Sequence, residues 1–180
     1  MEVIDNRDNL IKMLGKDLKI MEIGIFKGEF SKFIFNELQP CELHLVDLFD
    51  GQMCSGDKDG NNIVWTDLSK EYVNLSSYFE NEKNVILHKG FSYDVLSKFD
   101  DNYFDMIYID GDHSYDGVKK DLELAIEKVK SGGYIAGHDY NKYMFEGVVR
   151  AVDEFCLSKG LKIKYITNDG CPSYLIENIK

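Results

Sequence analysis

The sequence predicts an α/β fold, a mostly parallel β-sheet flanked by helices, built as a single domain over residues 1–180. Two observations predict this fold. Short runs of Leu, Ile and Val alternate along the chain with amphipathic patterns of helical period, which is the order of βα units. The chain has 180 residues, 44% of them hydrophobic, so it can bury one core and is too apolar to be disordered.

The turn after the first strand carries a strong local signal. A buried strand at 18–24 breaks at Gly24 and Gly28 before a helix pattern resumes. Glycines let the backbone approach a ligand closely, and the following helix N-terminus faces the pocket. A dinucleotide fingerprint, G-x-G-x-x-G, needs a middle glycine, where this sequence has Phe26. The carboxylate of Glu22 suits a ligand with an ammonium or sulfonium group and repels a phosphate.

The elements around this turn follow in order. An amphipathic helix is expected at 4–14, within the first sixteen residues, and another at 29–38. A second strand at 42–47 ends in Asp47, where a carboxylate can accept two hydrogen bonds from ribose hydroxyls. Leu48 would then lie under the attached base.

The connection that spans residues 49–84 is unusually long for an α/β domain. Its first part is polar and rich in glycine, and a helix is predicted around 68–81. A long loop at the carboxyl ends of strands is where a substrate lid would lie. Trp65 is a candidate either to pack over the substrate or to anchor the loop.

Three more strands are expected, at 84–88, 104–110 and 134–137. Ser92 follows the first of them and can serve as the N-cap of a short helix. A longer helix with a regular apolar stripe separates the last two strands and is expected to end at 131–133.

Ionisable side chains gather directly after two of these strands. Asp110, Asp112 and His113 follow one strand, and His138 and Asp139 follow the next. Because the carboxyl ends of parallel strands meet at one sheet edge, we expect these groups to lie beside one another. Such a concentration of like charges is unfavourable for stability and indicates a site.

The C-terminal part predicts a helix at 145–155 and strands at 161–167 and 173–179. The first of these strands alternates apolar and polar residues, which is typical of a strand buried on one face. The two strands are expected to turn back on each other as an antiparallel hairpin.

Composition and charge limit the partners. Twenty-one basic and 32 acidic residues give a net charge of −11, which opposes binding to a nucleic-acid backbone. We expect no membrane association, because no signal-peptide pattern or apolar run long enough to span a bilayer occurs. Four scattered cysteines without C-x-x-C predict free thiols in a reducing cytoplasm.

Four strings carry a family resemblance: Glu22–Gly28, Ile109–Tyr115, Gly132–Tyr140 and Gly147–Asp153. The first resembles motif I of the class I S-adenosylmethionine-dependent methyltransferases. Together they resemble the bacterial small-molecule methyltransferases of the methyltransferase-24-like family, which includes macrocin-type O-methyltransferases, and more distantly catechol O-methyltransferase. This resemblance implies a Rossmann-like fold whose seven strands are ordered 3-2-1-4-5-7-6.

The resemblance also implies roles for particular residues. Phe30 departs from the Ser or Thr of relatives, which leaves Ser31 to contact the cofactor carboxylate, and Phe91 stands where an acid is common. A short N-terminal cover leaves room for a homodimer in which one subunit helps close the other's site. The residues expected to bind S-adenosyl-L-methionine are Glu22, Gly24, Phe26, Gly28, Ser31, Asp47, Leu48, Ser92 and Asp110.

A metal ion and a base are implied at the second cluster. In metal-dependent relatives, positions that match Asp110 and Asp139 hold Mg²⁺, and the position of His138 can contribute. Magnesium prefers oxygen ligands, so His138 is an awkward partner for it. Either Asp112 or His113 would be the general base, and the sequence does not choose between them.

Four functions are compared. The first is methyl transfer to a hydroxyl of a small molecule, such as a sugar or a natural-product intermediate. The second is metal-independent N-methylation of an amino sugar by the same fold. A nicotinamide-dependent oxidoreductase is disfavoured by the absent G-x-G-x-x-G, and a non-catalytic binding module by the intact cluster of acids and histidines.

Overall fold

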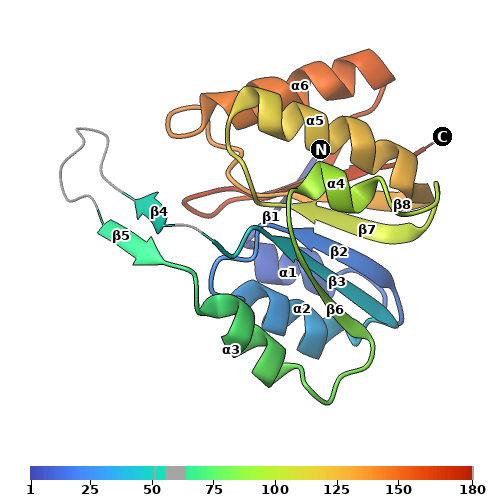
Figure 1. The fold of residues 1–180 in the computed structure, drawn as a ribbon. Helices are drawn as coiled ribbons and strands as arrows, with labels where there is room; N and C mark the ends of the chain where they lie inside the picture. Colours follow the sequence, from blue (N-terminus) through green and yellow to red (C-terminus); the bar gives the residue numbers. More distant parts are fainter. Residues whose placement is uncertain (51, 56–63, 180) are drawn as a thin grey trace.

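The computed structural model describes residues 1–50, 52–55 and 64–179. Its centre is an eight-stranded sheet in the order β1-β9-β10-β8-β7-β2-β3-β6 (Figure 1). β10 runs antiparallel to both of its neighbours, and the other paired strands are parallel. The strands are β1 (Glu2–Ile4), β2 (Lys19–Ile23), β3 (Glu42–Asp47), β6 (Val85–Lys89), β7 (Phe104–Ile109), β8 (Val129–Gly137), β9 (Ile163–Thr167) and β10 (Tyr174–Glu177).

The predicted strand order is confirmed, and the predicted number of strands is wrong. The expected order 3-2-1-4-5-7-6 corresponds to β6-β3-β2-β7-β8-β10-β9. The eighth strand is β1, which pairs with the outer side of β9 and places Glu2 opposite Tyr165. The helix expected at 4–14 is shorter: Ile4 belongs to β1, Asn6 is the N-cap and Met13 the C-cap.

Six helices of the described chain cover the two faces of the sheet, and Figure 1 shows α1, α2 and α3 on one face and α4, α5 and α6 on the other. The longest of these helices have 14 residues. Within the described ranges, no helix is both long enough and apolar enough to cross a membrane. The helices are α1 (Arg7–Lys12), α2 (Glu29–Leu38), α3 (Glu71–Tyr78), α4 (Ser92–Leu96), α5 (Tyr115–Lys128) and α6 (Glu146–Lys159).

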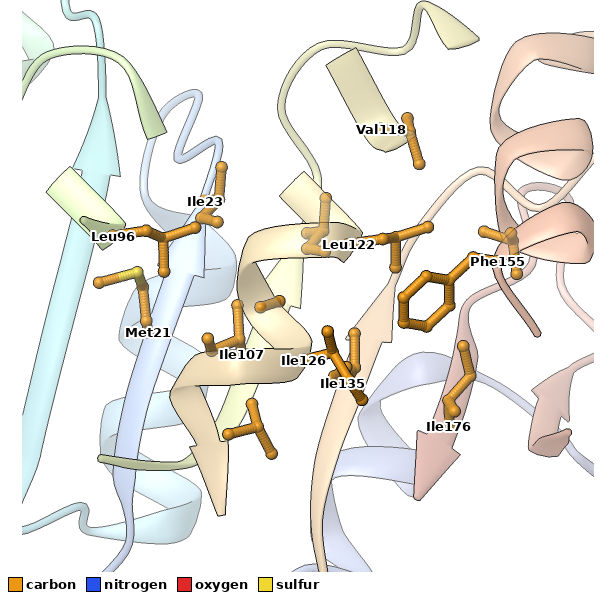
Figure 2. Packing of buried hydrophobic residues seen from close by; sticks show 14 of the residues in the cluster. Met21, Ile23, Leu96, Ile107, Val118, Leu122, Ile126, Ile135, Phe155 and Ile176 are labelled. Atoms are coloured by element: carbon orange, nitrogen blue, oxygen red, sulfur yellow. The ribbon is translucent and has the colours of Figure 1, made fainter. Parts of the chain in front are cut away.

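A hydrophobic cluster fills the space between the sheet and α4, α5 and α6. Leu122 and Ile126 of α5 and Phe155 of α6 lie against Ile107 and Ile135 of the central strands (Figure 2). All five side chains are buried. The stripe predicted along α5 is thus the surface that packs on the sheet.

Alternation along β2 separates this cluster from a second one on the opposite face. Met21 and Ile23 belong to the first cluster, whereas Ile20 packs in the second with Ile11 of α1 and the buried side of α2. Successive side chains of a strand point to opposite faces, so Glu22 shares the face of Ile20. A central parallel strand is covered on both faces, and this position is therefore buried.

The long connection after β3 contains structure of its own. β4 (Gln52–Ser55) and β5 (Val64–Asp67) pair antiparallel in a separate two-stranded sheet, which lies away from the central sheet in Figure 1. α3 follows and is shorter than the helix predicted at 68–81. The Trp65 side chain lies outside the described residues, and the role of this segment as a lid stays a prediction.

The boundary between α5 and β8 also differs from the prediction. The expected helix end at 131–133 lies inside β8, which begins directly after the helix. The register between β7 and β8 shifts here, so that Phe104 faces Val129 and Met106 faces Tyr134. Gly132 has a positive φ of 79°, a conformation found at helix ends and in bulges, and the register shift identifies a bulge here.

Candidate active site

A cavity of about 610 Å³ lies at the carboxyl ends of β2, β3, β6 and β7. This is the edge where an open α/β sheet binds its ligands. Six residues predicted to bind the cofactor line the cavity, and Asp112 lines it as well; the six are Gly24, Phe26, Asp47, Leu48, Ser92 and Asp110.

The glycine turn brings the backbone against the neighbouring strand end. Gly24 has a φ of +85°, and a Cβ built on it would lie 2.0 Å from the carbonyl oxygen of Asp110. Gly28 begins α2 with a φ of +76° and is packed against the side chain of Leu75. No other residue type fits the space at Gly24, which explains the glycine there. Phe26, at the tip of the turn, is 43% exposed.

Asp47 is fixed by the turn beside it. Its Oδ2 accepts hydrogen bonds from the backbone N–H groups of Ile25 (2.8 Å) and Phe26 (3.3 Å). Its Oδ1 accepts one from the N–H of Phe49 (2.9 Å). Oδ2 already accepts two hydrogen bonds, whereas Oδ1 accepts one and keeps a lone pair that can accept from a ligand. The position is consistent with the predicted contact to a ribose.

Glu22 and Ser31 do not line the cavity. Their side chains are buried between β2 and α2, with exposures of 1% and 0%. Among the described residues, Glu22 Oε2 and Ser31 Oγ have no well-formed hydrogen bond. Burial raises the pKa of Glu22 to about 8, although the neighbouring Ser31 hydroxyl opposes that shift. A largely neutral, enclosed carboxyl does not supply the exposed negative charge that the sequence suggested, and direct contact of either residue with a ligand stays untested.

The cavity still carries negative charge from other residues. Among the described residues that line it, the acids are Asp47, Asp110, Asp112, Asp116 and Asp121, and the base is Lys120. An excess of carboxylates favours a cationic ligand over one that carries a pyrophosphate.

The predicted cluster of acids and histidines forms beside the cavity. His113 Nε2 lies 3.1 Å from Asp139 Oδ2 and 3.6 Å from Asp110 Oδ1. His138 Nδ1 lies 3.1 Å from Asp139 Oδ1 and 3.7 Å from Asp110 Oδ1. The loops after β7 and β8 therefore bring together four of the five side chains that the sequence placed here, all except Asp112. We call these four residues the acid–histidine cluster.

Charge within the cluster changes the protonation of its members. The neighbouring Asp110 carboxylate raises the pKa of His113, and the charge of Asp139 adds to this rise. Burial disfavours the charged form of Asp139, but the hydrogen bond from His138 and the charges of both histidines outweigh it and lower its pKa. The cluster thus stabilises an ionised carboxylate beside a readily protonated imidazole.

The cluster also offers a set of metal ligands. Ligand atoms of Asp110, His113 and Asp139 lie within 4.8 Å of one another. His113 Nε2 is buried and lacks a well-formed hydrogen bond among the described residues, so a cation would satisfy it. Two carboxylates and an imidazole fit a divalent cation, with more nitrogen than Mg²⁺ prefers. The grouped histidine is His113, whereas the sequence suggested His138.

Asp112 and His113 face different surroundings, although they are adjacent. Asp112 lines the cavity, accepts a hydrogen bond from the backbone N–H of Ser114 (2.8 Å) and packs against Gly117. It supports the start of α5, together with the Ser114 side chain that accepts from the Gly117 N–H. His113 instead points at the two carboxylates of the acid–histidine cluster.

Arg7 is a residue of the site that was not predicted from the sequence. Its guanidinium lies over the ring of Phe30, 4.2 Å from the centroid, and Nη1 is 3.7 Å from Asp110 Oδ2. A cation in the first turn of a helix is unfavourable for the helix dipole, so Arg7 at the start of α1 was a signal of a partner elsewhere. Asp121 of α5, a buried acid in the cavity wall, was missed as well.

Comparison with known proteins gives a consistent result. A family model described as a methyltransferase domain matches residues 21–140. The uncharacterized protein R132 of Acanthamoeba polyphaga mimivirus is 30% identical over 142 residues. That match covers 76% of this chain and 58% of the viral protein, so the chain spans little more than half of that relative's length.

Two solved structures share the fold. The O-methyltransferase NovP superposes with a TM-score of 0.65 at 17% identity, covering 97% of this chain and 80% of NovP. The N-methyltransferase NodS of Bradyrhizobium japonicum WM9, in complex with S-adenosyl-L-homocysteine, gives a TM-score of 0.64 at 12% identity, covering 97% and 86%. At such low identities the likeness concerns the fold.

Proposed function

Because this chain belongs to the methyltransferase domain family, we propose that it is an S-adenosylmethionine-dependent methyltransferase and that it methylates a hydroxyl group of a small molecule. The observation that carries the proposal is the acid–histidine cluster at the edge of the cavity. A hydroxyl is a weak nucleophile until its proton is removed, and the cluster holds both a base and a place for a cation.

The cavity supports the binding of S-adenosylmethionine. Gly24, Phe26, Asp47, Leu48 and Ser92 line it. In the proposed complex Asp47 binds the ribose, and Leu48 and Ser92 lie beside the base. The sulfonium of the bound cofactor supplies an activated methyl group. The carboxylates of the wall favour this positive charge, and they disfavour NAD.

We assign the proton transfer to His113. The imidazole is held by Asp110 and Asp139, which stabilise it once it has taken up a proton from the acceptor hydroxyl. Asp112 is committed to the start of α5 and to the cavity wall, and is the weaker candidate. A divalent cation held by Asp110, Asp139 and His113 would be an alternative to this role of His113, because a nitrogen that ligates a metal cannot accept a proton; the cation would lower the pKa of an adjacent substrate hydroxyl instead.

The first test is ligand-dependent thermal unfolding. The melting temperature is measured with S-adenosylhomocysteine, with NADH and with neither, each in EDTA and then with Mg²⁺ or Mn²⁺. A ligand at 100 times its dissociation constant adds about 2.7 kcal/mol, a shift of roughly 5–10 °C for a domain of this size. A rise in melting temperature with S-adenosylhomocysteine but not with NADH supports the proposal. A rise with NADH but not with S-adenosylhomocysteine contradicts it.

Variants then test the chemistry. His113→Ala is expected to lower methyl transfer by about 10²–10⁴-fold, while the affinity for S-adenosylhomocysteine stays within threefold. Asp100→Asn, an exposed acid outside the cluster, is the matched control for the loss of a titratable group. Transfer to amine acceptors but not to hydroxyl acceptors, unaffected by EDTA, would replace the proposal with N-methylation.

A further inference from the structure

Asp121 is a buried acid in the cavity wall that the proposed methyl transfer does not use. It lies on the face of α5 that points into the cavity, and it is 3% exposed. Acidic side chains are rarely buried without a partner or a ligand. Its Oδ1 accepts a hydrogen bond of 2.5 Å from the hydroxyl of Ser92, at the start of α4. Two helices thus place one polar pair at the same wall.

The pKa of Asp121 is raised but stays below neutral pH. Burial raises the pKa of Asp121 to about 6, the Ser92 hydrogen bond opposes the rise, and the charge of Asp112 adds to it. Lys120 lowers the pKa of Asp121 slightly, but its Nζ lies 3.2 Å from the centroid of the Tyr93 ring. At pH 7.5 the carboxylate is therefore mostly charged.

An ionised carboxylate with a serine hydroxyl donating to it offers hydrogen-bond acceptors only. Asp121 has no proton to donate, and Ser92 has already committed its proton to Asp121. A ligand N–H group placed here can donate a hydrogen bond to these acceptors. A ligand carbonyl oxygen placed here, itself an acceptor, has no donor to pair with. Adenine carries an amino group on carbon 6, and hypoxanthine carries a carbonyl at the same position.

We propose that Asp121, together with Ser92, binds the 6-amino group of the cofactor's adenine and makes this enzyme reject 6-oxopurine analogues. The inference rests on the proposed function, which places S-adenosylmethionine in this cavity. Ser92 and Leu48, the residues expected beside the base, line the same cavity as Asp121. Asp121 is thus a specificity residue for the cofactor and takes no part in moving the methyl group.

The test is the equilibrium binding of S-adenosylhomocysteine and S-inosylhomocysteine at pH 7.5, measured by calorimetry. These two ligands differ only at the edge of the base. The wild-type protein is expected to prefer the adenine form by about 30-fold or more, because the 6-oxo form leaves a buried acceptor unpaired. Asp121→Asn supplies an amide donor, so the preference should fall at least tenfold. Glu123→Gln, an exposed acid on the same helix, is the charge-matched control and should keep the preference.

The outcomes separate this inference from the proposed function. If the wild-type protein binds neither ligand, the proposed function fails and the inference fails with it. If it binds both equally, or if folded Asp121→Asn keeps the full preference, only the inference is overturned. If Asp121→Asn does not fold, the wild-type protein is measured at two pH values. Protonation of Asp121 at pH 5 supplies a hydrogen-bond donor, so the preference of the wild-type protein for the adenine ligand must be smaller at pH 5 than at pH 7.5. A preference unchanged between these two pH values overturns the inference.

Discussion

Two acids at neighbouring strand ends show how burial decides the chemistry of a residue. Glu22 is the last residue but one of β2, and Asp47 is the last residue of β3, both next to the glycine turn. Asp47 reaches the cavity and is held by three backbone N–H groups, so it can act as an acceptor for a ligand. Glu22 is enclosed by β2 and α2 and favours its neutral form. Asp47 can therefore take part in a binding site, whereas Glu22, with the same functional group, is part of the protein interior.

Glu22→Gln is predicted to change the pH dependence of stability. Unfolded Glu22 releases its proton near pH 4.5, whereas in the folded protein its pKa is about 8. The unfolded state thus binds fewer protons between these values, and wild-type stability relative to the variant must fall as the pH rises from 5 to 8. The change is expected to be several kcal/mol, at most about 4, and to level off above pH 8.

Urea unfolding of both proteins at pH 5, 6.5, 8 and 9 measures this difference. Glu37→Gln, which replaces an exposed acid of α2, is the control and should show no comparable slope. A pH-independent difference between wild type and Glu22→Gln would mean that Glu22 is charged in the folded protein and paired, with Arg7 the nearest cation to consider.

The residues that gather at the site were predictable from the sequence, whereas the direction in which each side chain points was less predictable. Asp110, His113 and Asp139 could be placed together because the carboxyl ends of parallel strands meet at one edge. The burial of Glu22 and Ser31 was missed, since it depends on how α2 packs on β2. Alternation with Ile20 was an available signal, because a central parallel strand is covered on both faces.

At the scale of elements, α1 joins the N-terminal segment to both the core and the site. Leu10 and Ile11 on its inner face are 1% and 0% exposed, and Arg7 at its start approaches Asp110. The helix has only six residues, too few to be stable alone, so its packing must hold it in place.

Ile11→Ala is predicted to lower the free energy of unfolding by about 2–5 kcal/mol, because it leaves a cavity between α1 and the sheet. Leu157→Ala, at a position of α6 that is 85% exposed, removes the same number of carbon atoms and should change stability by less than about 0.5 kcal/mol. Chemical unfolding of both variants measures the two values. If Ile11→Ala changed the free energy of unfolding as little as Leu157→Ala, α1 would contribute nothing to the core.

Element prediction failed where the local pattern was too short or ambiguous. β1 has three residues, is mostly exposed and pairs with a strand far along the chain, so no periodicity marks it. The Ser-Gly-Gly stretch of β8 has the composition of a helix end, but it forms a bulge beside β7. The other βα units were predictable, because their buried strands are continuous apolar runs.

At the scale of the molecule, the net charge of −11 is the dominant electrostatic property. Repulsion among the excess acids destabilises the compact state, and salt screens it. Raising NaCl from 20 to 200 mM at pH 7.5 is predicted to increase the melting temperature by about 3 °C. Near pH 5, close to the isoelectric point of about 4.8, the same change of salt should have little effect. Scanning calorimetry at both pH values checks this, and a salt effect of equal size at pH 5 would point to a bound ion.

The pairing of β1 with β9 has a consequence for how the protein reaches its folded state during synthesis. Val3 lies opposite Ile166, so the contact joins residues from the two ends of the described chain. Translation proceeds from the N-terminus, and β1 has no partner until β9 has left the ribosome. The ladder that anchors β1, next to α1 and Arg7, therefore closes only after β9 has been synthesised. Nascent chains that stop short of β9 would hold most of the central strands, yet would lack the anchor that ties the start of the chain to the sheet.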